Sequence, residues 1–123
     1  MKRCHCRWLI NGAIVFSLLG CSPYWTEPPY EVYWIDGTKT LGYELGDGAF
    51  ISRVDEPVNI ASNNRYLSVY ACPETQCAFY YIDKEKDHKY ADHDEFVYGP
   101  FSRQQFELVA DKNGLPSVSM NKD

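Results

Sequence analysis

Residues 83–95 form a short charged segment in which metal binding is the first chemistry to consider. His88 and His93 lie there among several carboxylates, and imidazole with carboxylate is a common ligand set for zinc and other divalent ions. The spacing of the two histidines matches no established metal motif, and the interleaved lysines oppose cation binding. We therefore favour a solvated hairpin loop without a metal or cofactor site, and keep zinc binding as the alternative.

Signatures of catalysis are missing from the sequence. It contains no Gly-x-Ser-x-Gly, no His-Glu-x-x-His and no glycine loop of the kind that cradles phosphate. Gly42, Gly46 and Gly48 are followed by neither a lysine nor a helix pattern, so we interpret them as turn formers at strand ends. We predict that the protein is not an enzyme and assign no catalytic residue. A hydrolase whose site is assembled from distant residues is a further hypothesis.

The first twenty residues have the organisation of a secretory signal peptide. Lys2, Arg3 and Arg7 supply positive charge, and a short apolar run extends from Trp8 to Gly20. Because a membrane-spanning helix needs ~20 apolar residues, a run of this length favours a signal peptide over a transmembrane segment.

The tetrapeptide Leu18-Leu19-Gly20-Cys21 resembles the lipobox of bacterial lipoproteins. This resemblance implies that residues 1–20 are cleaved off and that the thiol of Cys21 carries acyl chains such as palmitate. Two or three such chains anchor a protein stably, whereas one holds only marginally. Ser22, where an aspartate tends to retain enteric lipoproteins in the inner membrane, implies a lipid anchor in the bacterial outer membrane, with the protein facing the periplasm.

The charge balance limits the partners of the processed chain. The whole chain has a formal net charge of −5, and residues 1–20 hold three basic and no acidic residues, so the remainder is more acidic still. An acidic surface repels phosphate backbones and anionic head groups. We therefore exclude nucleic acid as a partner and attribute membrane contact to the lipid anchor.

Cys72 and Cys77 remain once Cys4 and Cys6 leave with the signal and Cys21 is acylated. An even pair of cysteines in an exported chain indicates a disulfide in an oxidising compartment. A redox-active or metal-binding pair typically has the tighter Cys-x-x-Cys spacing. We predict a structural disulfide that closes a hairpin loop.

Short β segments separated by turn signals dominate the chain after residue 29. The proline-rich residues 21–29 are predicted to form a tether, and residues 30–123 a single β-rich domain. Leu67, Val69 and Ala71 alternate with polar and tyrosine positions, which predicts one buried strand face. The predicted strands are residues 31–35, 41–45, 49–54, 58–62, 66–72, 77–83 and 95–98.

A helix is predicted from Ser102 to about Asn113. Ser102 is placed to be its N-cap, and Gln105, three residues later, completes a capping box. Gly114 follows the last turn and favours helix termination. The expected architecture is an α+β fold, mainly β, in which an antiparallel sheet of six to eight short strands carries one C-terminal helix packed on it.

Aromatic residues make up 15% of the chain. Tyrosine is ordinary at half-buried strand positions, but tyrosine and tryptophan are also typical of binding surfaces. The pair Tyr24-Trp25 and the strand face that holds Tyr66 and Tyr70 are the candidates for an exposed aromatic patch. For any single one of these residues, we favour packing in the core or against a loop over exposure.

Three segments together resemble a pattern found in small bacterial lipoproteins of unknown function. They are residues 80–83, residues 97–106 with the motif Tyr-Gly-Pro-Phe-Ser, and Gly114-Leu115-Pro116. Residues 42–53 are similar to the early strands of these lipoproteins, so the resemblance covers most of the processed chain. It implies an aromatic strand, a Gly-Pro turn and a closing helix, but no activity. Residues 79–116 are also similar to the GYF-type peptide-binding domain, which has the same local order.

The function predicted from these features is a non-catalytic binding or accessory role in the cell envelope, with an envelope protein as partner. The acidic surface and the aromatic excess favour it. The alternative is an immunity or inhibitor lipoprotein that neutralises an exported toxin or cell-wall-degrading enzyme. Many such enzymes are basic, and opposite charges accelerate encounter.

Overall fold

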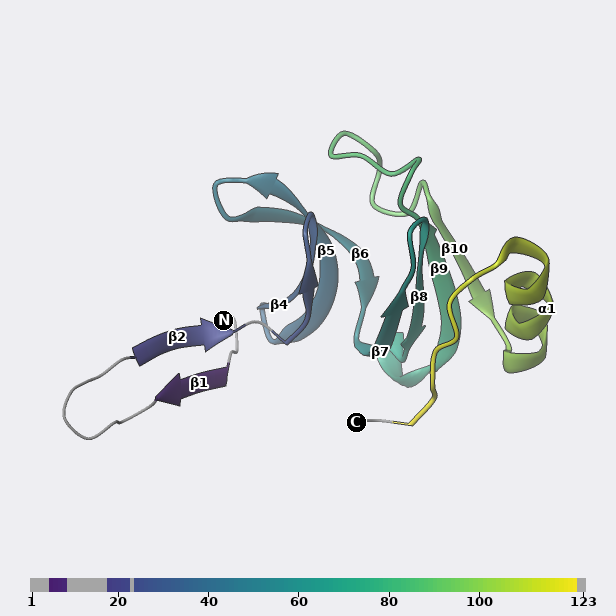
Figure 1. Ribbon diagram of the computed structural model, residues 1–123, viewed down its shortest axis with the longest axis horizontal. Helices are drawn as coiled ribbons and strands as arrows, with labels where there is room; N and C mark the ends of the chain where they lie inside the picture. The colour runs from purple at the N-terminus through teal and green to yellow at the C-terminus, as the bar shows by residue number, and fades with distance from the viewer. Residues whose placement is uncertain (1–4, 9–17, 23, 122–123) are drawn as a thin grey trace.

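Two antiparallel sheets of four strands each and one C-terminal helix make up the body of the protein. The computed structural model describes residues 24–121 with their side chains, and residues 5–8 and 18–22 by their backbone alone. Figure 1 shows the two sheets facing each other, with the helix on the far side of the second sheet. The structure is 48% strand and 14% helical, which confirms the predicted α+β class.

Within each sheet, strands that are neighbours in the sequence are also neighbours in space. The first sheet has the order β3-β4-β5-β6 and consists of Thr26–Glu27, Tyr30–Ile35, Thr38–Gly46 and Ala49–Asp55. The second sheet contains β7 to β10, which span Pro57–Ser62, Tyr66–Ala71, Ala78–Asp83 and Val97–Phe101. Helix α1 spans Arg103–Asn113, and the 3-10 turn Pro73–Thr75 follows β8. The N-terminal strands β1 (His5–Trp8) and β2 (Leu18–Ser22) pair with each other.

The division into two sheets corrects the prediction of a single sheet, and it arises at Glu56. Asp55-Glu56-Pro57 separates the predicted strands 49–54 and 58–62. In the structure Glu56 has a φ of 52°, and its N–H donates to the carbonyl of Lys39 at 2.7 Å. The chain therefore leaves the first sheet at a corner, and β6 and β7 belong to different sheets.

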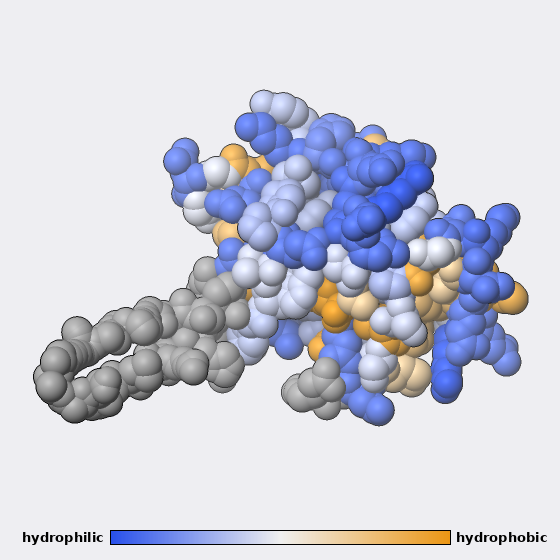
Figure 2. Space-filling view, in the orientation of Figure 1, coloured by the Kyte–Doolittle hydropathy of each residue, from blue (hydrophilic) through white to orange (hydrophobic). Residues whose placement is uncertain are grey.

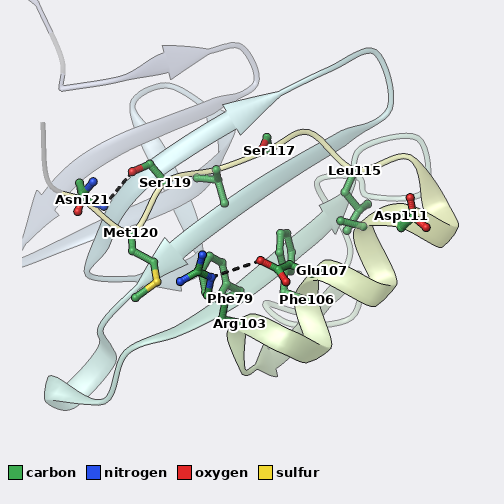
Figure 3. A pocket seen from close by; sticks show the side chains of 12 residues that line it. Phe79, Arg103, Phe106, Glu107, Asp111, Leu115, Ser117, Ser119, Met120 and Asn121 are labelled. Carbon is green, nitrogen blue, oxygen red and sulfur yellow. Dashed lines mark hydrogen bonds and ion pairs between the residues drawn. The ribbon is translucent and has the colours of Figure 1, made fainter.

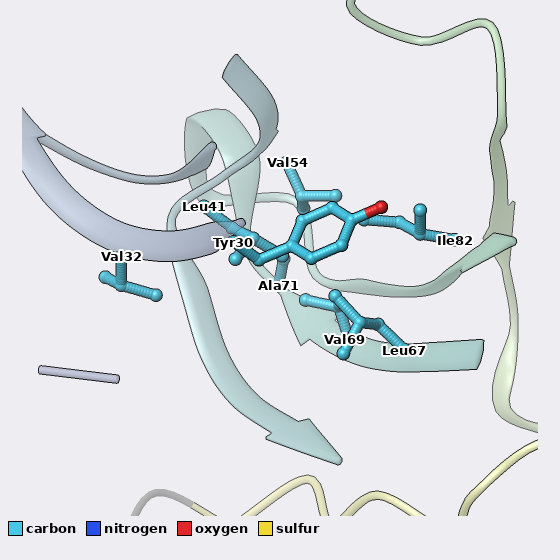
Figure 4. Close-up of a cluster of buried hydrophobic side chains, with 8 residues drawn as sticks. All are labelled: Tyr30, Val32, Leu41, Val54, Leu67, Val69, Ala71 and Ile82. Atoms are coloured by element: carbon cyan, nitrogen blue, oxygen red, sulfur yellow. The ribbon is translucent and has the colours of Figure 1, made fainter. Parts of the chain in front are cut away.

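The main hydrophobic core lies between the two sheets (Figure 4). Each sheet contributes the apolar side chains of its inner face, which are nearly inaccessible to solvent. The inward direction of Leu67, Val69 and Ala71 confirms the alternation predicted for this strand. The buried core residues are Tyr30, Val32, Leu41, Val54, Leu67, Val69, Ala71 and Ile82.

Helix α1 covers the outer face of the second sheet through a second apolar cluster. Phe106 of the helix stacks on Phe79 of β9, with ring centroids 4.9 Å apart. Tyr66 and Tyr70, proposed from the sequence as an exposed patch, are half-buried against this cluster. The helix covers the face that was the candidate for an exposed patch, and the favoured interpretation, packing, is confirmed for both residues.

Both ends of α1 confirm the sequence prediction. The hydroxyl of Ser102 accepts from the N–H of Gln105 at 3.1 Å, and the Gln105 side chain accepts from the N–H of Ser102 at 2.9 Å. The helix ends at Asn113, and Gly114 follows in the left-handed conformation with a φ of 71°. The last strand, predicted at 95–98, lies at Val97–Phe101 and leads almost directly into the helix.

The predicted tether over residues 21–29 is too long. Trp25 packs against the main core, and its carbonyl accepts from the N–H of Val32 at 2.9 Å. Strand β3 then pairs with β4 at Thr26 and Glu27. Because these residues gain backbone and side-chain partners, the chain belongs to the folded domain from Tyr24 onward despite its prolines.

Candidate functional site

A groove of about 740 Å³ lies between α1 and the C-terminal segment, residues 115–121 (Figure 3). Its floor is apolar, since Phe79 from β9, Phe106 from α1 and Leu115 at the start of the segment are buried there. Figure 2 shows hydrophobic residues gathered between the sheets and the helix, whereas the surface of the upper loops is mostly hydrophilic.

Asn59 in β7 and Asn63 in the turn after it hold the C-terminal segment in place opposite the helix. The side-chain amide of Asn63 donates to the carbonyl of Gly114 at 2.9 Å. The amide of Asn59, within β7, donates to the carbonyl of Ser119 at 2.8 Å and also to that of Asn121. The segment is therefore fixed at both ends against β7, and the groove between it and the helix is part of the fold.

The charged side chains of the groove come from α1. Arg103 and Glu107 both line it and pair with each other at 3.3 Å, whereas Asp111 adds one further negative charge to the rim. The described lining contains no histidine and no cysteine. The arrangement suits the binding of apolar groups flanked by positive charge.

A polar cluster is buried where the first sheet meets segment 83–95, and sequence reasoning missed it. Arg53 forms a bidentate ion pair with Asp87, in which Nε and Nη2 each lie 2.9 Å from a carboxylate oxygen. Both side chains are 1% exposed. The hydroxyl of Tyr30 donates to the same carboxylate at 2.9 Å. Burial and the Asp87 charge raise the pKa of Tyr30, which keeps this hydroxyl a donor at physiological pH.

A β-bulge directs Arg53 into the interior. Leu41 pairs with Val54, but Gly42 pairs with Ser52, so Arg53 is the extra residue in β6. Such a bulge breaks the alternation of side chains, and Arg53 and Val54 are both buried although they are adjacent. Strict alternation would place one of the two in solvent.

Asp87 comes from the charged segment 83–95, which is therefore not simply a solvated loop. Its buried carboxylate and the nearly inaccessible Ala91 attach the segment to the body of the protein. At its start, Asp83 accepts from Arg65 at 3.0 Å and from backbone N–H groups. Burial opposes ionisation of Asp83, but these hydrogen bonds lower its pKa overall. The prediction of a wholly solvated loop is wrong at these positions.

The structure does not bring the two histidines together at one site. His88 Nδ1 accepts from the N–H of Tyr90 at 3.2 Å, whereas His93 lies beside Asp94 at the surface. Among residues 24–121, no three His, Cys, Asp or Glu side chains form a group that could hold a metal ion.

Cys72 and Cys77 form the predicted disulfide, with an S–S distance of 1.97 Å. It closes the loop between β8 and β9. Because the loop is short, the disulfide constrains the unfolded chain only modestly, so replacing both cysteines by serine is expected to lower the unfolding free energy by ~2 kcal/mol. Urea denaturation of the two proteins measures this difference. A variant that is unfolded in buffer would contradict the expectation.

The other predicted positions lie near the N-terminus. Tyr24 is 40% exposed, whereas Trp25 is half-buried and packs against the core. The backbone of Cys21 lies in β2, but its side chain is outside the described residues. No helix in the described parts of the chain has the length and apolar character to cross a membrane.

Comparison with models of protein families, with curated proteins and with solved structures finds no match to this chain.

Proposed function

We propose that this protein is a lipoprotein anchored through Cys21 in the bacterial outer membrane, where it faces the periplasm and binds an envelope protein without catalysing a reaction. The lipobox-like tetrapeptide supports the anchor, and the disulfide between Cys72 and Cys77 is consistent with an oxidising compartment. The groove between α1 and residues 115–121 is the observation that carries the binding role.

The chemistry of the groove favours a partner segment with apolar and basic side chains. The floor at Phe79 and Phe106 is apolar, although each of the two residues is only 5% exposed. On the rim, Asp111 attracts positive charge, while Glu107 is already paired with Arg103. Met120, which is 45% exposed, forms part of the opposite wall, and methionine adapts its shape to varied apolar partners. An extended segment lying along α1 would contact all of these groups at once.

Adding positive charge to the groove tests the proposal. Replacing Asp111 and Met120 by lysine is expected to reduce the amount of partner cross-linked in intact cells about tenfold, equivalent to ~1.4 kcal/mol of binding free energy. The measurement is mass spectrometry of the proteins captured on the tagged, lipid-anchored chain.

Leu108→Lys supplies the matched control. Leu108 is on the same helix and is 74% exposed, but it does not line the groove. This variant should capture the same envelope protein as the unaltered chain. Equal capture by the groove variant and the control, or capture of no envelope protein by the unaltered chain, would overturn the assignment of the groove.

A further inference from the structure

One end of the first sheet combines aromatic side chains with a lysine, although the chain as a whole is acidic. Tyr24 packs on Trp34, with ring centroids 6.3 Å apart, and Lys39 Nζ lies 5.3 Å from the Tyr24 ring. Trp34 and Lys39 are partners in the pairing of β4 with β5. Beside them, at the end of β4, Ile35 is 51% exposed.

A shallow hollow of about 340 Å³ adjoins this cluster. Tyr24, Trp25 and Val32 line one side of it, and β7 lines the other. Its described lining contains one cation, Lys39, and no carboxylate. Apolar and aromatic walls with a single positive charge suit the region where phospholipid acyl chains meet their phosphate groups.

The chain itself brings this end close to the proposed anchor. Tyr24 follows Cys21 by three residues, which span about 10 Å when fully extended. Tyrosine and tryptophan are enriched where a membrane meets water, because one part of each ring system is apolar and another is polar. An acyl chain on Cys21 would thus hold Tyr24 and its neighbours at the bilayer surface.

We propose that this aromatic end, formed by Tyr24, Trp34 and Ile35 with Lys39, rests in the headgroup region of the phospholipid bilayer to which Cys21 is anchored. The inference rests on the proposed lipid anchor and adds a fixed orientation to it. Asp36, exposed at the adjoining turn, limits the contact to the interface, since a carboxylate is costly to bury in hydrocarbon.

The opposite end of the molecule is rich in charged side chains. Figure 1 shows that the chain enters the domain after β2 at one end of the sheets, whereas the loop between β9 and β10 projects at the other. That loop is rich in charge and carries Tyr90, which is 82% exposed. The proposed orientation points this loop away from the bilayer and leaves it in water.

The native tryptophans report the contact directly. The chain has three tryptophans, and once residues 1–20 are removed only Trp25 and Trp34 remain, both at the aromatic end. The acylated protein is placed in phosphatidylcholine vesicles whose chains are brominated either close to the headgroup or near the chain end. We expect tryptophan fluorescence to be quenched mainly by the headgroup-proximal bromines.

Paired variants locate the contact. Tyr24→Ser combined with Ile35→Ser is expected to lose most of this quenching, whereas Tyr90→Ser, which removes an exposed aromatic ring at the opposite end, keeps it. Circular dichroism verifies that each variant is folded. Quenching that is absent in the unaltered acylated protein, or that is the same in the double variant, overturns the inference.

Mass spectrometry of the same preparation separates the two proposals. An acylated Cys21 without quenching overturns the membrane contact alone and leaves the anchor in place. An unmodified Cys21 in protein taken from membranes overturns the anchor, and the proposed orientation with it.

Discussion

Replacing Asp87 by alanine is expected to lower the unfolding free energy by ~3–5 kcal/mol, since it leaves the Arg53 guanidinium buried without its counter-ion. The pair is 1% exposed on both sides, so water cannot replace the lost carboxylate. The Tyr30 hydroxyl loses its acceptor in the same step. Small domains are stable by only ~5–15 kcal/mol in total, and the variant should be close to unfolding at room temperature. Urea denaturation measures the difference.

Two further variants show whether the cost comes from the unpaired charge. Asp92→Ala removes an exposed carboxylate from the same loop and is expected to change stability by less than ~0.5 kcal/mol. Replacing Arg53 by methionine together with Asp87 by leucine removes both charges at once, which should restore most of the lost stability. Equal destabilisation by Asp87→Ala and Asp92→Ala would show that the buried pair contributes nothing.

Cys21→Ala is expected to move the protein from the membrane fraction to the soluble fraction. Acyl chains bind a bilayer with ~0.8 kcal/mol per buried CH₂ group, and without the thiol none can be attached. Fractionation and immunoblotting of the tagged protein measure the change.

Replacing Cys72 and Cys77 by serine is the matched control, because it also removes thiols but none that the lipobox assigns to acylation. This variant should stay with the membranes. A Cys21→Ala protein that sediments with membranes as fully as the unaltered chain would be inconsistent with a lipid anchor at this position.

Local sequence signals predicted the parts of the fold that depend on neighbouring residues. The helix starts at Ser102 and ends before Gly114 because capping and left-handed termination are decided within one turn of the chain. The Cys72–Cys77 disulfide and the buried face of β8 follow equally from short-range spacing.

Features that depend on distant residues were not predictable in this way. The corner at Glu56 looks like an ordinary turn until the second sheet exists to receive β7. Asp87 stands in a run of charges that is typical of solvated loops, and nothing nearby indicates that Arg53, 34 residues earlier, will pair with it. The bulge that turns Arg53 inward leaves no recognisable mark on the alternation of β6.

The candidate binding groove also depends on residues that lie far apart in the sequence. Its floor joins Phe79, Phe106 and Leu115, and its far wall is held by Asn59 and Asn63 from β7 and the turn after it. The sequence left Tyr66 and Tyr70 as candidates for an aromatic surface instead, because the strand pattern cannot show which face the helix will cover.

The most direct test of the proposed binding role of the groove is photo-cross-linking from single positions in living cells. A photoreactive amino acid is placed at Met120, in the groove, or at Leu108, on the outer side of α1. We predict a discrete adduct with one envelope protein from position 120 and none from position 108. The same adducts from both positions, or none from position 120 while the protein is in the membrane fraction, would contradict the account.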